Sequence, residues 1–492
     1  MRGRHNEAVS TYKRGPAREH FNAFEKEETS VRLLHGKDIG NPSWRRSLPH
    51  MLIAAISSFL FGYHLGVVNE TLESLSVDLG FSGSTLAEGL VVSACLGGAF
   101  VGSLFSGWLA DGVGRRRAFQ LCALPMIIGA SVSATTKNLW GMLLGRLLVG
   151  AGMGIGPPVA ALYVAEISPA FIRGTFGSFT QIATCLGLMG SLFIGLPAKE
   201  IGGWWRVCFW VSAVPAAALA FLMEFCAESP HWLFKKGRGT EAEAEFERLL
   251  GGIHVKFAMA ELSRSDSGDE SDTVKFSELL HGRHFKVVFL GSALFALQQL
   301  SGINAVFYFS STVFKSFGIP SDLANICIGI ANLSGSVIAM ILMDKLGRKL
   351  LLLGSFSGMA VSLSIQVIAA SSLTSGSRAL YLSVGGVLLN GQCRFVLMFS
   401  LGAGPVPSLL LSEIFPGRIR AEAMAICMAV HWVINFFVGL FFLRLLEQIG
   451  AQYLYSIFAT FCFVAVIFVK RNVVETKGKT LQEIERALVP PE

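Results

Sequence analysis

Twelve long apolar segments limit the folds open to this chain more than any other feature. A bilayer core is crossed by about 20 apolar residues in a helix, and backbone groups inside it must be satisfied within the protein. The chain is 52% hydrophobic and 15% charged, which is far too apolar for a soluble protein of 492 residues. We therefore predict an all-α membrane protein with twelve transmembrane helices. They are expected near residues 50–69, 87–109, 118–136, 140–163, 176–196, 206–226, 285–314, 322–343, 350–371, 380–413, 421–445 and 452–470.

The positive charges indicate how these helices are oriented. Basic clusters follow the even-numbered spans, at 115–117, 173, 235–238, 348–349, 418–420 and 470–471. Cytoplasmic loops carry such an excess of Lys and Arg, so both tails should lie on the cytoplasmic side or its equivalent in an organelle. The net charge of +7 thus reflects orientation, and we expect no nucleic-acid partner.

The chain repeats itself, which predicts two pseudo-symmetric six-helix halves. The run Asp111-Gly-Val-Gly-Arg115 returns as Asp344-Lys-Leu-Gly-Arg348. Parallel repeats of this kind enclose a binding site near the membrane midplane and rock about it. We assign residues 1–47 to an N-terminal tail, 48–226 to the first half, 227–284 to a linker with short helices, 285–471 to the second half and 472–492 to a C-terminal tail.

One polar stretch interrupts the seventh apolar segment. Gln298, Gln299, Asn304 and Tyr308 lie within eleven residues, and polar groups at this depth should face a protein interior or a water-filled cavity. On an unbroken helix Gln299 and Asn304 would point roughly 140° apart, so we expect the helix to loosen at Gly302. Amides donate and accept hydrogen bonds, which suits a neutral ligand rich in hydroxyl groups. The alternative is that these groups only join helices.

Nothing in the sequence indicates catalysis, a cofactor or a metal. The nine cysteines are scattered, mostly within apolar runs, without a Cys-x-x-Cys or zinc spacing. The glycines of 150–156 fall inside an apolar span, where they permit close helix contact rather than phosphate binding.

These motifs resemble the sugar porter family of the major facilitator superfamily, over roughly residues 50–484. They are Gly107-Trp-Leu-Ala-Asp111-Gly-Val-Gly-Arg115-Arg116, Arg146 before Gly150-Ala-Gly152, Tyr163-Val-Ala-Glu166, Glu228-Ser-Pro230, Gln298-Gln299-Leu-Ser-Gly302-Ile-Asn304 and Glu475-Thr-Lys-Gly. Two further runs, from Phe61 to Gly66 and from Ala429 to Trp432, resemble the plant plastidic-type glucose transporters. The resemblance implies a plastid envelope protein with the monomer as functional unit. The acidic residues of the N-terminal tail are untypical of a transit peptide, so another endomembrane or the plasma membrane stays open.

The resemblance also implies a sugar site built mainly by the second half. The expected sugar-contacting residues are Gln181, Gln298, Gln299, Asn304, Asn332, Trp432 and Asn435, with Tyr308 closing the cavity. Trp432 would lie against the C–H face of the sugar ring while the amides bind its hydroxyls.

Four positions depart from the family pattern. His64 stands where proton-coupled members carry Asp beside the arginine matched by Arg146, which favours facilitated diffusion and leaves proton coupling as the alternative. Ser400 and Ser408 replace a Glu and a Trp of the tenth span, so the pocket is expected to be wider. His431 stands where facilitators often carry Asn.

The tenth span should contain a hinge, and the basic side a gate. Gly404, Pro405 and Pro407 break the helix because proline lacks an N–H. The polar run Asn390–Arg394 earlier in that span is expected to be a bulge, a loop or an insertion. Ion pairs between the halves would form an inner gate from Asp111, Arg115, Arg116, Glu166, Arg173, Asp344, Arg348, Glu413, Arg418 and Arg420.

We therefore expect a transporter that moves a hexose, glucose first among the candidates, by alternating access and without an enzymatic step. Its partners would be the sugar and the bilayer, with protons an open alternative. A proton-coupled hexose symporter is the mechanistic rival. A membrane sugar sensor that does not transport is the rival of another class, disfavoured by the short tail after Arg471.

Overall fold

The computed structural model describes residues 41–169, 172–199, 202–267, 282, 284–316, 320–371, 378–415 and 419–477. Eleven stretches of these residues are long and apolar enough to cross a membrane. The last of them, within α18 (Arg420–Asn472), contains Gly450 with φ 80° and ψ 162°, so it is two helices joined at a kink. The twelve predicted spans are therefore helical where they are described, apart from the breaks at residues 301–302 and 404–405.

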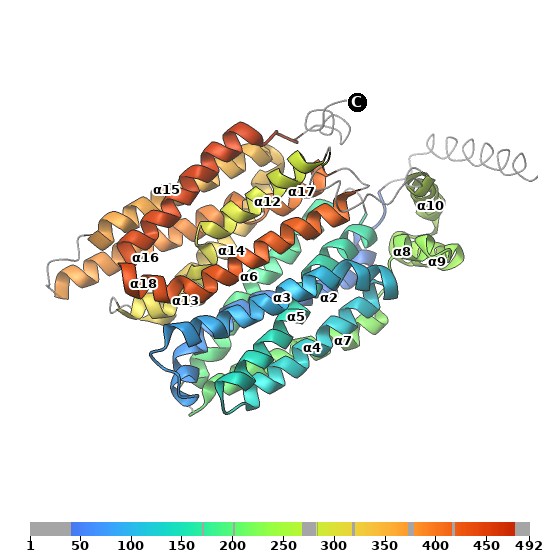
Figure 1. The fold of residues 1–492 in the computed structure, drawn as a ribbon. Helices are drawn as coiled ribbons and strands as arrows, with labels where there is room; N and C mark the ends of the chain where they lie inside the picture. The colour runs from blue at the N-terminus through green and yellow to red at the C-terminus, as the bar shows by residue number, and fades with distance from the viewer. Residues whose placement is uncertain are drawn as a thin grey trace, which may run out of the picture.

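The first six spans form the lower bundle of Figure 1, which we call the N-terminal half. Its helices are α2 (Trp44–Asp78), α3 (Thr85–Val113), α4 (Arg115–Thr135), α5 (Leu139–Ile167), α6 (Arg173–Ala198) and α7 (Trp204–Leu222). Glycines on α5 allow its close contact with α3: an added Cβ at Gly150 would lie 1.9 Å from the carbonyl oxygen of Cys95. The expectation that these glycines serve helix packing agrees with this geometry.

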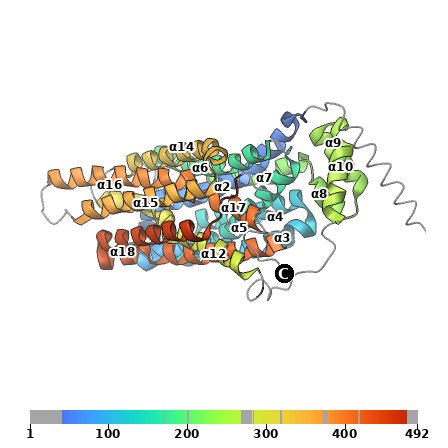
Figure 2. The same cartoon turned by 90° about the horizontal axis from the view of Figure 1, so that it is seen from above.

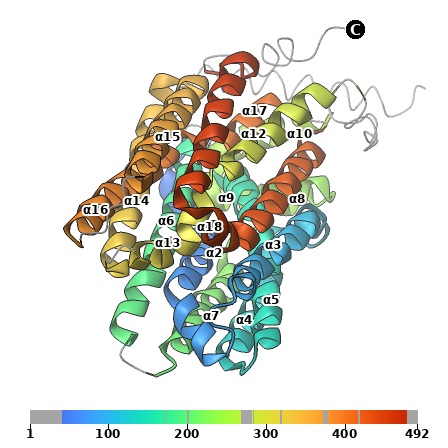
Figure 3. The same ribbon diagram turned by 60° about the vertical axis from the view of Figure 1, so that its left-hand side comes forward.

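The last six spans form the upper bundle, which we call the C-terminal half (Figures 1 and 3). Its elements are α12 (Phe285–Leu300), α13 (Ile303–Ser316), α14 (Ser321–Leu346), α15 (Arg348–Ser371), α16 (Arg378–Met398), a π-helical turn (Phe399–Ala403), α17 (Val406–Ile414) and α18. The two halves meet along α2 with α13, α3 with α18, and α6 with α14.

The linker helices α8 (Pro230–Lys235), α9 (Gly239–Leu250) and α10 (Gly252–Ser267) lie at one end of the bundle (Figure 2). We call this the basic end, because the turns with Arg115 and Arg348 lie there, and we call the opposite end the far end. Pro230 starts α8 and the Ser229 hydroxyl caps it by accepting from the N–H of Trp232 at 3.1 Å.

Both predicted breaks are present. Gly302 has φ +83° and separates α12 from α13. The π-helical turn Phe399–Ala403 and the two prolines separate α16 from α17. The prediction of a bulge or loop at Asn390–Arg394 is wrong, because these residues lie inside regular α16, with Asn390 and Arg394 on its exposed face and Gln392 buried.

Candidate functional site

The amides of the seventh span converge across the break at Gly302. Gln299, near the end of α12, accepts a hydrogen bond from Asn304 Nδ2 through its Oε1 at 2.5 Å. Its Nε2 lies 3.2 Å from Gln298 Oε1 and 3.0 Å from His431 Nδ1. The break thus brings together groups that a continuous helix would point apart, as the sequence predicted.

A second contact joins this cluster to the hinge of the tenth span. Gln298 Nε2 donates to the carbonyl oxygens of Ala403 at 2.6 Å and Gly404 at 3.3 Å. In a regular α-helix the Ala403 carbonyl would bond the N–H of residue 407, but Pro407 has none. Gln298 therefore satisfies a carbonyl that the proline leaves free.

Residues of the eleventh span complete the amide side of the site. Asn435 and the Tyr308 hydroxyl are buried and hydrogen-bonded, with Asn435 Nδ2 3.2 Å from the phenol oxygen. The Trp432 ring meets Phe61 of the N-terminal half edge-on at 6.1 Å. Its indole Nε1 is buried without a hydrogen-bond partner among the described residues.

Two predicted sugar-contacting residues lie on other helices and make other contacts. Asn332 on α14 accepts from the Ser400 hydroxyl at 2.6 Å through Oδ1, so the serine that replaces the family glutamate still faces this amide. Gln181 on α6 is half-buried, one turn before Cys185, whose Sγ lies 3.3 Å from the Ser336 hydroxyl of α14. Among the described residues, neither of these two amides hydrogen-bonds the Gln298 cluster.

His64 and Arg146 are close, as expected, but the contact goes through the backbone. Arg146 Nη2 lies 3.3 Å from the carbonyl oxygen of His64, and its Nε lies 3.4 Å from that of Val91. Both side chains are almost fully buried, and Arg146 forms no ion pair with any residue that the structure describes. The guanidinium is held by carbonyls and by the Phe209 ring at 5.9 Å.

The ion pairs described at the basic end lie within each half, so in this conformation none of them joins the halves as the predicted inner gate would. Arg115 binds Glu166 at 2.8 Å and Asp111 at 3.1 Å, and Arg348 binds Glu413 at 3.0 Å. Arg116 pairs with Glu224 at 3.1 Å, again within its own half. The side chains of Arg173, Asp344 and Arg420, and all of Arg418, lie outside the described residues.

Equivalent glutamates cap equivalent helices at this end. Glu228 accepts from the backbone N–H of Arg115 at the start of α4, and Glu475 accepts from that of Arg348 at the start of α15. Burial raises the pKa of Glu228. Burial acts in the same direction on Glu475, but four backbone N–H groups outweigh it and lower the pKa. The internal repeat is thus one local structure used twice.

At the far end, polar contacts do join the halves. Lys199, just after α6, pairs with Glu70 of α2 at 3.0 Å and with Asp322 of α14. Lys315 of α13 pairs with Glu73 of α2 at 2.5 Å. We call these five residues the far-end cluster. None of these five residues belongs to a motif that the sequence analysis used.

Hydrogen bonds also join the two halves beside the far-end cluster. Asn69 on α2 donates to the Ser310 hydroxyl of α13 at 2.7 Å and accepts from the N–H of Ser311 at 3.0 Å. A pocket lined in part by Asn69, Ser191 and Asn325 lies between the halves there. All the described ion pairs between the halves are therefore at the far end.

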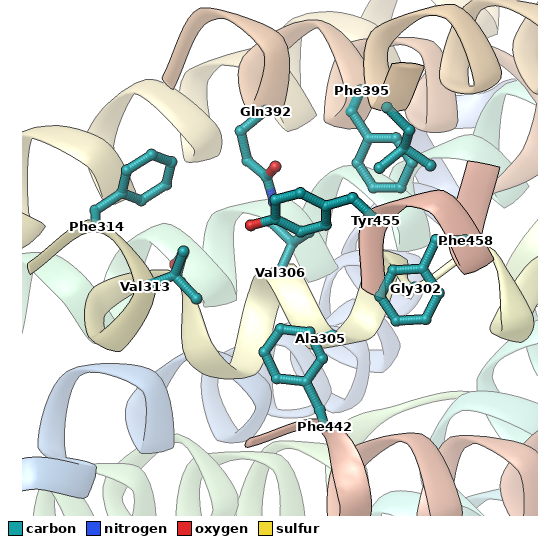
Figure 4. Close-up of a pocket in the computed structure, with 12 residues that line it drawn as sticks. Gly302, Ala305, Val306, Val313, Phe314, Gln392, Phe395, Phe442, Tyr455 and Phe458 are labelled. Atoms are coloured by element: carbon teal, nitrogen blue, oxygen red, sulfur yellow. The ribbon is translucent and has the colours of Figure 1, made fainter. Parts of the chain in front are cut away.

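A second pocket lies on the other face of α13 (Figure 4). Val306 and Val313 line it from α13, whereas Asn304 and Tyr308 leave the same helix on the opposite face. Gln392 and the Tyr455 ring lie close together in the middle of this view. The remaining lining is mostly apolar, including Phe314, Phe395, Phe442 and Phe458. This pocket is therefore separate from the amide cluster.

Comparisons with known proteins give this geometry a context. Residues 50–488 match the model of the family described as "Sugar (and other) transporter". The "Probable plastidic glucose transporter 3" of Arabidopsis thaliana is 70% identical over 99% of this chain and 97% of its own. The "Glucose transport protein" of Synechocystis sp. is 33% identical over 88% of this chain and 95% of its own.

Solved structures agree with these sequence matches. The proton:xylose symporter XylE bound to 6-bromo-6-deoxy-D-glucose superposes with a TM-score of 0.75, at 28% identity over 89% of this chain and 98% of that one. The inward open conformation of XylE from E. coli also gives 0.75, over 90% of this chain and 99% of that one.

Proposed function

The chain belongs to the sugar transporter family of the major facilitator superfamily, and on that premise we propose that it carries a monosaccharide, glucose first, across a membrane by alternating access. The observation that carries the proposal is the amide cluster at the break between α12 and α13. Gln298, Gln299 and Asn304 present donors and acceptors within a buried, largely apolar bundle, which is the chemistry that sugar hydroxyls require.

We propose that this conformation is closed at the far end. The ion pairs of Lys199 with Asp322 and of Lys315 with Glu73 join the halves there, while the described pairs at the basic end stay within a half. Alternating access then requires the far-end contacts to break when the basic-end contacts between halves form. Sugar shifts these populations only through a difference in its affinity for the two states.

We further propose facilitated diffusion rather than proton symport. Arg146 is held by the backbone carbonyls of His64 and Val91, without a carboxylate partner among the described residues, so no acid is placed there to carry a proton. The plastid envelope is the proposed location, because two relatives at 70% and 68% identity are named as plastidic glucose transporters.

Uptake of radiolabelled glucose into proteoliposomes, with and without an inward proton gradient, tests the proposal. We expect equilibration that does not depend on the gradient. Gln298→Ala should lower uptake at least about tenfold, because it removes a sugar amide and leaves the Ala403 carbonyl unpaired, at a cost of about 1–3 kcal/mol.

Two outcomes would contradict the proposed function. Accumulation above equilibrium only with the gradient would make the protein a symporter. Saturable binding of glucose without flux in either condition would identify a sensor. Gln120→Ala is the matched control, since this amide lies near the basic end and contacts Glu224 and the carbonyl of Ala220.

A further inference from the structure

The polar run of α16 places an arginine and an asparagine on a face of the helix that the rest of the protein leaves open. Asn390 and Arg394 are exposed and lie one turn apart, with Val387, 45% exposed, on the same face. Gln392 and Phe395 are buried on the other side of the helix. Neither Asn390 nor Arg394 forms a hydrogen bond or an ion pair with a residue that the structure describes. The donors of a guanidinium and of a carboxamide are therefore available to a ligand.

This open face of α16 borders the lipid. The helix packs mainly against α14 and α15, and it lies at the outer edge of the C-terminal half (Figures 2 and 3). Within the spans, the large exposed side chains of those two helices are apolar, among them Ile330, 51% exposed, and Ile368, 69% exposed. Exposed apolar side chains on a membrane-spanning helix are suited to contact with hydrocarbon tails. Arg394 therefore faces the bilayer and not the amide cluster.

The depth of Arg394 lets it reach the headgroups at the far end. Its apolar span begins at Gly386, so the Cα atom of Arg394 lies eight residues, about 12 Å, inside the span. Side chains of a helix lean toward its N-terminus, and α16 begins at the far end because α15 runs there from the basic end. The guanidinium can thus extend past Asn390, one turn nearer the far end, to the boundary between tails and headgroups.

We propose that Asn390 and Arg394 form a binding site for the phosphate headgroup of an anionic lipid in the far-end leaflet. The guanidinium is always charged, and its planar fork of donors matches phosphate oxygens. Asn390 adds amide donors one turn closer to the headgroups. A cation at the edge of the hydrocarbon needs a counter-charge, and no carboxylate among the described residues supplies one. The proposal does not depend on the proposed function.

A second copy of this chain is the other candidate for this face, and the charges disfavour it. A two-fold contact uses the same patch on both copies, so it would bring Arg394 close to its equivalent. Like charges repel strongly where water is scarce. A lipid phosphate instead supplies the opposite charge, and its tails cover the apolar side chains around the site.

Native mass spectrometry of the full chain in detergent micelles, titrated with phosphatidylglycerol or with phosphatidylcholine, tests the proposal. The first lipid carries a net negative charge, whereas choline neutralises the phosphate of the second. We expect one phosphatidylglycerol to bind about tenfold more tightly than phosphatidylcholine, because hydrogen bonds to charged groups are the stronger ones. Arg394→Gln should lose this preference. Arg394→Lys keeps the charge without the fork and should retain part of it.

Arg444→Gln is the matched control. Arg444 is an exposed arginine of α18, six residues before the kink at Gly450, and Glu447 lies one turn away on the same helix. This variant should bind phosphatidylglycerol as tightly as the unmodified protein does. Asn390→Ala should weaken binding about threefold, less than Arg394→Gln, because the amide is neutral.

Three results would overturn the proposal. Equal losses in Arg394→Gln and Arg444→Gln would show that any exposed arginine attracts the lipid. Equal affinity of the unmodified protein for the two lipids would remove the role of charge. A dimer that dissociates in Arg394→Gln would assign the face to a second copy.

Crosslinking of the unmodified protein covers the case in which Arg394→Gln does not fold. Phosphatidylglycerol with a photoreactive group on its headgroup should label α16, and peptide mass spectrometry locates the labelled residues. Labelling of other helices without α16 would contradict the proposed site.

Discussion

Among the residues of the membrane interior, Arg146 differs from the amides of the α12–α13 cluster in how its polar groups are satisfied. Each of Gln298, Gln299 and Asn304 bonds another polar atom of the cluster or the hinge. Arg146 is 2% exposed, and its Nη1 has no partner among the described residues. A buried cation without a counter-charge is costly, so this position is sensitive to any acid placed nearby.

Replacing His64 by Asp should pair this cation. We expect His64→Asp to raise the thermal unfolding midpoint and to make uptake respond to protons, because the carboxylate can gain and lose one beside Arg146. One proton per sugar supports about tenfold accumulation for each pH unit of gradient. The measurement is the accumulation of glucose in proteoliposomes across a gradient of one pH unit.

The isosteric amide is the control for that substitution. His64→Asn offers no titrating group, so its uptake should reach equilibrium and stop, as in the unmodified protein. Equal accumulation by the Asp and Asn variants would show that the gain does not come from the carboxylate.

The sequence predicted the polar residues that meet at the break between α12 and α13, but not their partners. Gln298 and the Pro405–Pro407 hinge were each predicted from local chemistry, one from polar groups in an apolar run and the other from missing N–H groups. Their contact joins residues 105 positions apart in the chain. No local pattern carries that information, because it depends on how α12 packs against the hinge.

At the scale of the helices, the break between α12 and α13 depends on a single residue. Gly302 has φ +83°, and an added Cβ would lie 2.5 Å from the Phe458 ring of α18. The break carries Asn304 and Tyr308 toward the amide cluster on one face of α13 and leaves the pocket of Figure 4 behind the other.

Gly302→Ala should therefore impair transport more than folding. The left-handed conformation costs a residue with a side chain about 1–3 kcal/mol, and the contact with Phe458 adds to this. We expect glucose uptake to fall by about tenfold or more, since Asn304 can no longer reach Gln299. The measurement is the rate of glucose uptake per mole of folded protein. The amount of folded protein is determined by size-exclusion chromatography.

A second glycine supplies the comparison. Gly354 lies on an exposed face of α15, and an added Cβ there meets nothing within 4 Å. Gly354→Ala should leave transport unchanged and stabilise α15 by about 0.5–1 kcal/mol. Transport by both variants at the rate of the unmodified protein would show that the break at Gly302 is not needed to position Asn304.

Helix positions and breaks were predictable because hydropathy and proline or glycine chemistry act locally. The Asn390–Arg394 run shows the limit: its polar residues suggested an interruption, yet α16 continues through them. Asn390 and Arg394 share an exposed face, whereas Gln392 faces the interior beside Tyr455. A polar run within a span therefore does not by itself break a helix.

For the whole molecule, the two ends differ in what joins the halves. The far-end cluster links α2 and the end of α6 to α13 and α14, and the side chain of Glu70 within it is only 4% exposed. Burial lowers the pKa of Lys199, but Asp322 and Glu70 outweigh this and raise it above its usual value. Lys199 therefore stays protonated at neutral pH and keeps both carboxylates paired.

Removing this cation should favour the conformation that is open at the far end. Lys199→Gln leaves Glu70 without its ion pair, which costs more than an exposed pair because Glu70 is buried. A Ser191→Cys reporter in the far-end pocket should then react about tenfold faster with an impermeant thiol reagent added on that side.

Lys199→Arg keeps the charge and should preserve the slow rate. The protein without the Ser191→Cys reporter gives the background of the nine native cysteines. Identical rates with Gln and Arg at position 199 would mean that the far-end cluster does not hold the halves together.

The contact of Gln298 with the Ala403 carbonyl has a kinetic consequence. The main hydrogen-bonding groups of the cluster satisfy one another, so a carrier that reorients without sugar exposes few polar groups that lack a partner. The carrier can then reorient back to the first side of the membrane without binding a second sugar. Such a carrier catalyses net transport of sugar down its gradient. A carrier whose polar groups lacked partners without sugar would instead be limited to one-for-one exchange.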